Sequence, residues 1–425
     1  MQPGEPVLLV CHAFPPVAGI GGRRWAKFAK ELARRGHTVH VVRCGTRPGR
    51  PASLWSEDAD TPGIVHHVLP ARYPAVLTQV EVASLADKLR YHAWMKVLPW
   101  LCKGNWYDPT IFWRKQLRRK AKELVHRHGI RQVIATGAPF RLMAYAAELK
   151  LDLPHLHLVV DLRDEWTWKD HYGLASIGAG RRQREMAMEA RVMQLADQVT
   201  TPHARIVEHL QRTYPGDPAK YKVLPHAVDP ADFDAATFPA EDGIFRMVYA
   251  GSLYGAGEAD VYFEQLLGAF EALRTNRPGA FACCRLDLYI TGHDVGAYRT
   301  KVAARGLAEQ VRFHPPVPPK EVFRLIKASN VVILYIPQVN KDILGTKFQE
   351  IFYAGTPILH VGEPGVVSRT IREKRMGDTV RVEELVQELP RILSGERQVR
   401  CDRHADHSAY LLPSVTDKLL REVLV

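Results

Sequence analysis

Short apolar runs that alternate with longer helical segments constrain the fold of this chain more than any other feature of its sequence. Near the N-terminal end, the run VLLVCHAF is followed by a glycine-rich turn, a periodic segment and the run HTVHVV. In the periodic segment Trp25, Phe28 and Leu32 recur at three- and four-residue spacing, while lysines and arginines lie on the other side. This pattern predicts a strand, a turn, a helix closed by Gly36 and a second strand.

The same rhythm recurs in two series. The first continues at residues 131–140 and 154–166, and the second begins at residues 245–255, after a short stretch rich in Pro and Asp. Apolar runs that end in polar or small residues are typical of strands buried on both faces of a parallel sheet, with functional loops at their C-terminal ends. Because 425 residues exceed the usual domain of roughly 100 to 200 residues, we predict an α/β protein with two Rossmann-like domains and a boundary within residues 225–234.

Composition and charge narrow the class of protein. Hydrophobic residues make up 46% of the chain and charged residues 24%, as in ordinary globular proteins. No apolar run is long enough to span a membrane, and no basic region precedes the first apolar run, so we expect a cytoplasmic protein without a cleaved signal. The six cysteines form no CxxC pair and are expected to be reduced. The net charge of +12 predicts an anionic partner, which a nucleic acid, an anionic lipid, a phosphorylated acceptor or a nucleotide would each satisfy.

Two glycine-rich turns have the composition of phosphate-binding loops. They are GIGGRR at residues 19–24 and LGTKF at residues 344–348. Without a Cβ the backbone can approach a phosphate closely, and the amides at a helix N-terminus donate hydrogen bonds to it. The first turn lacks the full GxGxxG pattern, and a simple tight turn is the alternative for both.

Two carboxylates flank the second turn. Asp342 and Glu350 lie eight positions apart, and Glu350 is placed one turn into the predicted helix. A carboxylate behind phosphate-binding amides can accept hydrogen bonds from ribose hydroxyls, as an acidic residue does in dinucleotide-binding folds. A solvated surface glutamate is the alternative.

Residues 91–128 differ from the rest of the chain because they contain four of its eight tryptophans and a cluster of basic residues. One interpretation is a surface for a membrane or an acidic acceptor, with aromatic anchors and basic side chains. The other is a packed helix with a solvated face. The membrane interpretation would use as anchors and cations Trp100, Trp106, Trp113, Arg114, Lys115, Arg118 and Arg119.

The order of several motifs resembles that of retaining GT-B glycosyltransferases of the family 4 type. The matching stretches include HAFPPVAGIGGRRW, VIATGAPF, VVDLRDEW, PHAVDPADF, YAGSLYG, LYITGHD and GTKFQEIFYAGTPIL, and they cover nearly the whole chain. The resemblance implies a GT-B enzyme with two Rossmann-like domains that face an interdomain cleft. Residues 1–225 would form the acceptor-side domain and residues 226–400 the nucleotide-sugar donor domain. Residues 401–425 would form a C-terminal helix that packs back towards the N-terminal domain.

The resemblance also assigns site residues. In that family two acidic residues flank seven others, and here they are Asp342, in place of the usual Glu, and Glu350. Glu350 would hold the ribose, and Asp342 would lie near the transferred sugar and act in catalysis. The three amides after Leu344 would face the diphosphate or the sugar. The donor-binding residues would be Gly21, Gly22, Arg23, Gly251, Ser252, Gly345, Thr346, Lys347 and Glu350.

A further departure from the family pattern concerns charge. The GS motif of Gly251 and Ser252 is not followed by the usual Lys, so Lys347, Arg23 or Arg24 would have to supply the positive charge. In the N-terminal half, the stretch DLRDEW offers further catalytic candidates, with a structural ion pair of the arginine as the alternative. These candidates are Asp161, Arg163 and Asp164. His226 occupies a position where Asn is common, and we expect it to be a hinge or capping residue.

The resemblance implies transfer of a hexose-type sugar from a nucleotide sugar with retention of configuration, in polysaccharide or glycoconjugate biosynthesis. The acceptor would be a glycan, a lipid-linked intermediate or a small molecule. We expect no bound metal and no cofactor, because the nucleotide sugar is a co-substrate. Peripheral contact with an anionic inner membrane face stays open. The alternatives are a GT-B epimerase or phosphorylase and, less favoured, a basic nucleic-acid-binding protein, which would leave the stretch around Glu350 unexplained.

Overall fold

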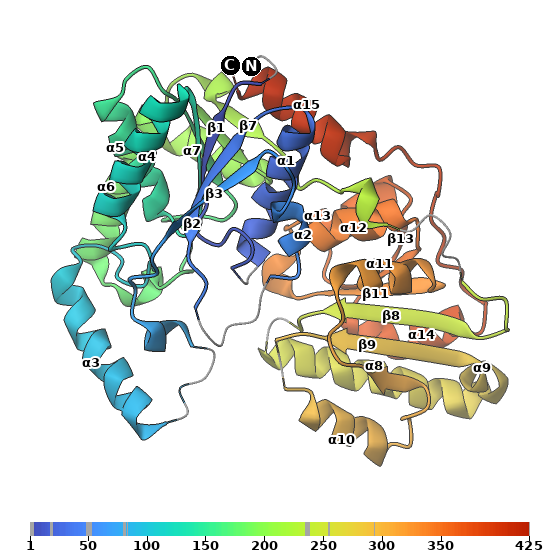
Figure 1. The fold of residues 1–425 in the computed structure, drawn as a ribbon. Coiled ribbons are helices and arrows are strands. Elements are labelled where there is room, and N and C mark those ends of the chain that lie inside the picture. The colour runs from blue at the N-terminus through green and yellow to red at the C-terminus, as the bar shows by residue number, and fades with distance from the viewer. Residues whose placement is uncertain are drawn as a thin grey trace. The chain divides into compact units, whose positions relative to one another are not determined.

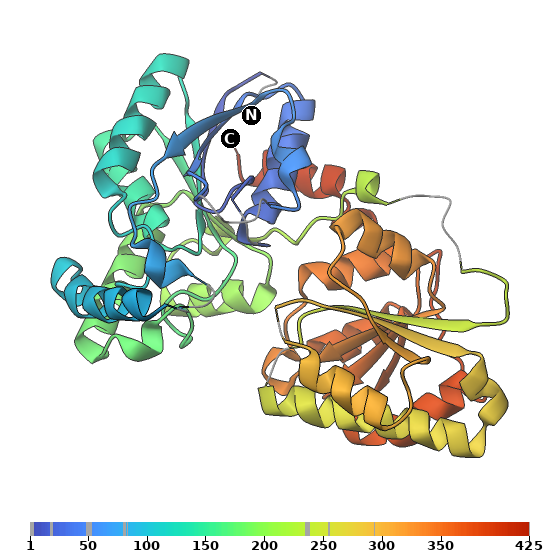
Figure 2. The same ribbon diagram turned by 60° about the horizontal axis from the view of Figure 1, so that its bottom comes forward.

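The computed structural model describes residues 4–17, 20–47, 53–79, 82, 84–233, 239–253, 256–292 and 294–424. The chain packs as two units (Figure 1 and Figure 2). The first unit comprises Met1–Ala227 and Leu412–Val425, and the second comprises Val228–Leu411. The sequence predicted the first boundary between residues 225 and 226 and the end of the second domain at residue 400. In the structure the two units meet after Ala227 and after Leu411.

The sheet of the first unit has seven parallel strands in the order β3-β2-β1-β4-β5-β6-β7. The order reverses between β1 and β4, and in sheets of this kind ligands bind outside the carboxyl ends of the strands at such a switch point. The strands are β1 (Val7–Val10), β2 (Val39–Cys44), β3 (Ile64–Leu69), β4 (Gln132–Gly137), β5 (His157–Leu162), β6 (Gln198–Thr201) and β7 (Tyr221–Val223).

Helices cover both faces of this sheet (Figure 1). The helices of the first unit are η1 (Ile20–Gly22), α1 (Arg23–Arg34), α2 (Ser56–Ala59), η2 (Ala75–Thr78), α3 (Leu85–Leu101), α4 (Arg114–His128), α5 (Arg141–Asp152), η3 (Leu174–Ser176), α6 (Ala179–Leu195), α7 (Ala204–Thr213), η4 (Pro218–Lys220) and α15 (Leu412–Glu422).

Strand β1 shows why its sequence is a continuous apolar run. Leu8 and Val10 belong to the core cluster that includes residues of α4 to α7, whereas Val7 and Leu9 belong to the cluster that includes residues of α1 and α15. Because side chains alternate between the two faces of a strand, a sheet covered on both sides requires apolar residues at every position. The prediction of parallel strands buried on both faces is therefore confirmed for β1.

The second unit repeats this topology. Its six parallel strands have the order β10-β9-β8-β11-β12-β13, so its switch point lies between β8 and β11. The strands are β8 (Phe245–Gly251), β9 (Cys284–Ile290), β10 (Val311–Phe313), β11 (Val331–Ile336), β12 (Ile358–Gly362) and β13 (Gly377–Val380). The helices are η5 (Pro230–Asp232), α8 (Ala256–Asn276), α9 (Pro278–Ala282), α10 (Gly296–Ala304), α11 (Pro319–Lys327), η6 (Gln338–Asn340), α12 (Thr346–Ala354), α13 (Val366–Glu373), η7 (Val382–Glu384), α14 (Leu385–Leu393) and η8 (Ser408–Tyr410).

The C-terminal helix α15 belongs to the first unit. Leu412, Val415 and Leu419 lie in the same core cluster as Trp25 of α1. At the surface Arg35 donates to Asp417 at 2.5 Å. The last helix of the chain therefore packs on one face of the first unit's sheet.

The tryptophan-rich region contains both buried and exposed side chains. Trp113 is fully buried in the first unit's core, and Trp106 is 9% exposed. Neither side chain can serve as a membrane anchor, so that part of the membrane hypothesis is wrong. Arg118 of α4 forms ion pairs with Asp152 and Glu148. Within the described ranges no helix has the length and hydrophobicity to cross a membrane.

His360 on β12 is an exception in the core of the second unit. Its side chain is fully buried, and neither ring nitrogen has a hydrogen-bond partner among the described residues. Burial, with a smaller effect of Arg372, lowers the pKa of His360 to about 4. The imidazole is therefore neutral at pH 7 and is buried at a cost.

Replacing His360 by leucine is expected to stabilise the protein and to weaken the acid dependence of its stability. The buried polar ring costs about 1–3 kcal/mol, which leucine removes. The native pKa is lowered, so the unfolded state takes up the proton first as the pH falls from 6.5 towards 4, and wild-type stability is lost in that window. Thermal unfolding at pH 7.5, 6 and 5 checks this. Equal losses on acidification in the two proteins would contradict it.

Candidate functional site

The switch point of the second unit collects most of the predicted donor residues. Strand β8 ends at Gly251 and is followed by Ser252, while β11 is followed by the loop that leads to α12. The side chain of Ser252 lies 3.1 Å from that of Thr291, which follows β9, with oxygen facing oxygen. The loops after three neighbouring strands therefore meet at one edge of the sheet.

Lys347 of α12 reaches across to the end of β8. Its Nζ donates to the carbonyl oxygen of Ala250 at 2.8 Å. A Cβ at Gly251 would lie 1.8 Å from this Nζ, and Gly251 has a φ of +151°. Glycine is thus needed here both for its backbone conformation and for the approach of the lysine. The ammonium group lies beside the loop that lacks a lysine of its own.

The N-terminal end of α12 adds backbone donors near this ammonium group. The N-cap is Gly345, which has no side chain to cap the helix, and Thr346 and Lys347 form its first turn. The positive end of a helix dipole and the first amides of a helix suit an anion. Glu350 follows on the same helix and is 5% exposed.

Asp342 lies in the loop before α12, and its carboxylate is engaged by the chain after β12. Its Oδ1 accepts from the backbone N–H of Val366 at 2.9 Å. A Cβ at Gly365 would lie 2.9 Å from the same oxygen, so glycine permits the close approach. The structure thus ties Asp342 to the start of α13, and its predicted catalytic role stays a prediction.

The switch point of the first unit brings together a second group of predicted residues. A Cβ at Gly22 would lie 2.0 Å from the carbonyl oxygen of Ala13, so the turn packs directly on the backbone after β1. Gly21 faces Arg163, because a Cβ there would lie 2.7 Å from Nη1 of that arginine. Arg163 in turn donates to the carbonyl oxygens of Gly137 at 3.0 Å and Ala138 at 2.5 Å. One guanidinium therefore joins the loops after β1, β4 and β5.

Asp161 is fully buried at the end of β5. Its carboxylate accepts hydrogen bonds from Trp25 at 2.7 Å and Thr200 at 2.8 Å, and from Thr136 at 3.1 Å and Arg24 at 3.2 Å. Arg24 also donates to the carbonyl oxygens of Leu224 and Pro225. Arg24 is thus held inside the first unit, and a catalytic role of Asp161 stays a prediction.

Two other predicted residues of the first unit, Asp164 and Arg23, each contact an aromatic side chain. Asp164 accepts from the hydroxyl of Tyr172 at 2.7 Å. Burial, together with the charge of Asp164, raises the pKa of Tyr172, so this hydroxyl remains a donor at neutral pH. The guanidinium of Arg23 lies over the ring of Trp55, 3.9 Å from its centroid.

Two further histidines at the strand ends were not singled out from the sequence. His12 follows β1 and packs on Trp113, and burial lowers its pKa to about 4. His203 follows β6, and burial likewise lowers its pKa to about 4, with a smaller effect of Arg205. A polar residue directly after a buried apolar run was the available signal, because such positions lie at the functional edge of the sheet. Both rings are neutral at pH 7.

His226, which was predicted to be a hinge or capping residue, packs near His203. Their ring centroids lie 5.9 Å apart with the rings nearly perpendicular. Burial, followed by the charge of Arg24, lowers the pKa of His226 well below its ordinary value. It is a neutral ring beside the last strand of the first unit, close to the unit boundary.

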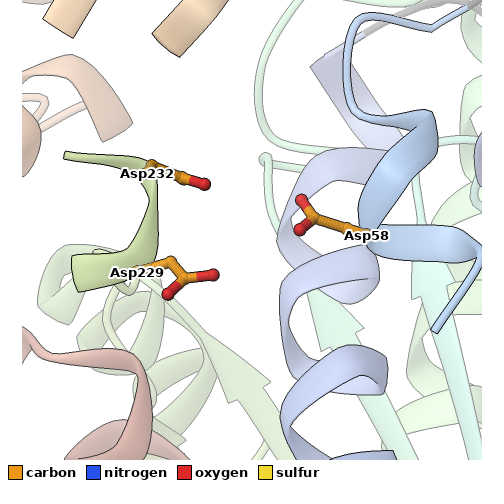
Figure 3. Close-up of side chains that lie close together, drawn as sticks. All are labelled: Asp58, Asp229 and Asp232. Atoms are coloured by element: carbon orange, nitrogen blue, oxygen red, sulfur yellow. The ribbon is translucent and has the colours of Figure 1, made fainter. Parts of the chain in front are cut away.

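Three buried aspartates have the chemistry of metal ligands. Figure 3 draws Asp229 and Asp232, which lie on the short segment that opens the second unit. Asp229 accepts from the N–H of Ala231 at 3.0 Å and so caps η5. Asp58, also drawn there, belongs to the first unit and is paired with Lys27 at 2.9 Å and Lys30 at 2.8 Å. These local partners account for Asp58 and Asp229 without a metal ion.

A family model matches the first unit. Residues 21–227 match the glycosyl transferase 4-like domain. The match shows that this part of the chain is similar to a glycosyltransferase domain, and it covers the predicted residues from Gly21 to Asp164. In a sequence comparison no curated protein matches the chain.

Solved structures match both units together. Sucrose-phosphate synthase from Thermosynechococcus elongatus is 15% identical, with a TM-score of 0.55, over 98% of this chain and 94% of that chain. A proposed UDP-N-acetylglucosamine 2-epimerase from Listeria monocytogenes is 14% identical, with a TM-score of 0.58, over 98% and 95%. HepE from Anabaena, solved with UDP-glucose, is 13% identical, with a TM-score of 0.54, over 97% and 93%. These likenesses confirm the predicted GT-B fold class, with two Rossmann-like parallel sheets.

Proposed function

We propose that this protein transfers a sugar from a nucleotide-sugar donor to an acceptor, with retention of configuration and without a metal ion. The observation that carries the proposal is the position of Lys347, which joins the N-terminal end of α12 to the glycine loop after β8. The match of residues 21–227 to a glycosyltransferase domain supports the same reaction class.

The chemistry of the reaction explains why such an arrangement is useful. As the bond between the sugar and the diphosphate breaks, negative charge develops on the leaving oxygen. Preorganised donors directed at developing charge are often the largest single contribution to catalysis. The ammonium of Lys347 and the amides at the start of α12 are donors of this kind at one edge of the second sheet, where Gly251 leaves room for the ammonium.

These donors are also why we propose a reaction without a metal ion. A divalent cation would neutralise the diphosphate and act as a Lewis acid, which is its usual role in phosphoryl and glycosyl chemistry. In the proposed site the charge of Lys347 takes that role. The carboxylate of Asp342, which precedes α12, already accepts a hydrogen bond from the N–H of Val366.

The remaining residues are assigned roles in the same reaction. In the second unit Glu350 would accept hydrogen bonds from the ribose hydroxyls, and Ser252 would donate to a phosphate. In the first unit Arg163 would direct polar groups of the loops after β1 and β4 towards the acceptor. The acceptor is proposed to be a glycan, a lipid-linked intermediate or a small molecule, and no nucleic acid is involved.

A donor screen tests the proposal. The full-length protein would be heated with UDP, GDP, ADP and dTDP sugars, because a ligand at 100 times its Kd adds about 2.7 kcal/mol of stability. The donor that binds would then be incubated with acceptors in EDTA, and the anomeric configuration of the product would be read by NMR. We expect transfer with retention in EDTA. Inversion, or activity restored only by added Mn²⁺, would contradict the proposed mechanism.

The same experiment distinguishes a glycosyltransferase from the second candidate function, a GT-B epimerase or phosphorylase. A GT-B epimerase would convert the nucleotide sugar to its epimer without an acceptor, and a phosphorylase would require inorganic phosphate. The fold shared with the Listeria protein keeps the first of these in consideration. Formation of an epimer, with no transfer to any acceptor, would replace the proposed function.

The change of Glu350 to glutamine is expected to weaken nucleotide binding about 10- to 100-fold. The amide loses one carboxylate acceptor and presents a donor to a ribose hydroxyl, and a hydrogen bond to a charged group contributes about 1.5–3 kcal/mol. Calorimetric titration with the nucleotide measures the change. Glu373→Gln, an exposed site on α13, provides the matched control. Equal affinities of the two variants would remove Glu350 from the donor site.

A further inference from the structure

Helix α3 is exposed along most of its length. Trp100 is 90% exposed, Leu85 76% and Leu89 66%, and Val97 and Leu101 are also exposed. Figure 1 and Figure 2 show this helix at the periphery of the first unit. Single exposed apolar residues are normal, but a contiguous group of large ones marks an interaction surface.

The exposed apolar residues form one stripe on α3. At 3.6 residues per turn all of them except Leu85 fall within an arc of about 140°. The stripe, which we call the α3 face, consists of Ala86, Leu89, Ala93, Trp94, Val97, Trp100 and Leu101.

The opposite side of α3 attaches the helix to its unit. Leu98 is fully buried in a cluster with Tyr73 and Trp106, and Met95 is partly buried. At the other end, Ser84 accepts from the N–H of Asp87 at 3.0 Å and so caps the helix. The helix is therefore held in place on one side while its apolar stripe faces solvent.

Basic residues border and interrupt the α3 face. Arg90 lies within the stripe and Lys96 at its edge, both side chains are exposed, and Lys103 follows just after the helix. The acidic residue on the helix, Asp87, lies within 3.4 Å of Arg90. The region around the stripe is thus positively charged, and a second copy of the same helix would bring like charges together.

The apolar surface continues beyond the end of α3. A pocket of about 500 Å³ begins at Leu101 and is lined by Phe112, Met188 and Leu195, with Lys103 and Arg191 among its basic residues. Apolar space bordered by basic groups suits an acyl chain with an anionic headgroup.

We propose that α3 lies in the headgroup layer of an anionic membrane, with the α3 face directed towards the acyl chains. Helices with Trp and Leu on one side and Lys and Arg around it bind in the interface plane, where the long basic side chains reach the headgroups. The proposal keeps Trp100 from the region predicted from the sequence and leaves out Trp106 and Trp113, which are buried. The proposal concerns binding and does not depend on the reaction that the protein catalyses.

Vesicle flotation with the full-length protein tests the proposal. We expect binding to vesicles of phosphatidylcholine with phosphatidylglycerol, weak binding to phosphatidylcholine alone, and release in high salt. Arg90→Glu with Lys96→Glu should weaken binding at least about 25-fold, because each basic residue near an anionic surface contributes about fivefold, or about 1 kcal/mol. Trp100→Ser should weaken it about tenfold through lost apolar burial.

Matched variants keep the test specific to α3. Lys115→Glu with Arg119→Glu makes the same change of charge on the exposed side of α4 and should leave most of the binding intact. Leu54→Ser removes an exposed apolar residue outside α3 and should have little effect. Brominated lipid should quench the fluorescence of Trp100 in the wild-type protein. The variant Trp100→Phe, which lacks this fluorophore, should show correspondingly less quenching. All the substituted side chains are exposed, so unchanged melting temperatures are expected.

Three results would overturn the proposal. The first is that the wild-type protein does not bind anionic vesicles at low salt. The second is that the α4 variant loses binding while the α3 variants keep it. The third is that α3 forms a contact between two copies of the chain. Sedimentation of wild type and Trp100→Ser detects the last of these. A positive vesicle result with no sugar transfer would refute only the proposed function, and the reverse would refute only the membrane surface.

Discussion

Replacing Lys347 by methionine is expected to lower the rate of sugar transfer about 100- to 1,000-fold. Its ammonium lies at the glycine loop after β8, 2.8 Å from the carbonyl oxygen of Ala250, where the leaving diphosphate is proposed to bind. Removing one preorganised donor from a site of developing charge typically costs about 2.7–4 kcal/mol of transition-state stabilisation. Methionine keeps most of the length of the side chain and removes its charge.

Steady-state kinetics with a saturating acceptor measures this effect. Lys341→Met is the matched control, since it removes the same charge from the loop that precedes α12. We expect the control to retain nearly full kcat. A similar loss in both variants would mean that general positive charge matters and that the position of Lys347 does not.

Changing Asp161 to asparagine is expected to destabilise the protein by about 3–5 kcal/mol. The carboxylate is fully buried and accepts from four side chains, of which Arg24 is charged. Burial already lowers the pKa of Arg24, opposed mainly by Asp161. Asparagine would leave that guanidinium buried without its counter-charge, and breaking a buried pair in this way is strongly destabilising.

Calorimetry of the first unit's transition in the full-length protein measures the loss. Asp170→Asn breaks an exposed pair with Arg182 and should cost less than about 1 kcal/mol. If Asp161→Asn melts like wild type but lacks activity, the carboxylate serves the reaction, as the sequence suggested, and the structural interpretation is contradicted.

The architecture could be predicted from the sequence because it depends on local patterns. The apolar run at Val7–Val10, the turn before Arg23 and the periodicity of Trp25, Phe28 and Leu32 each require only neighbouring residues. Both sheets and their parallel order follow from repetition of that pattern. The glycines at residues 21, 22 and 251 were also predicted from their motifs, and in the structure a Cβ at each would lie within 3 Å of another group.

The partners of the charged site residues could not be predicted, because they come from distant parts of the chain. Nothing near Asp161 in the sequence indicates that Arg24 and Trp25 would bind it. The sequence predicts Lys347, Arg23 or Arg24 as the source of positive charge, and only the tertiary structure places the ammonium of Lys347 at Ala250.

The tryptophans show the same limit. From composition, the four tryptophans between residues 91 and 128 were treated as one region, but in the structure Trp113 is buried and Trp100 is exposed. Whether an aromatic side chain faces a core or solvent depends on which face of its helix the rest of the fold covers. That information lies outside the segment itself.

The assignment of α15 to the first unit makes the second unit an insertion in the chain of the first. The polypeptide leaves the first unit after Ala227 and re-enters it at Leu412. At this crossing Val228 pairs with Leu411, and its N–H donates to the carbonyl oxygen of Tyr410 at 2.8 Å. The two ends of the inserted segment are thus adjacent, so we expect residues 228–411 to fold when they are expressed as a separate protein. In the first unit, a short linker from Ala227 to Leu412 would keep α15 on its sheet.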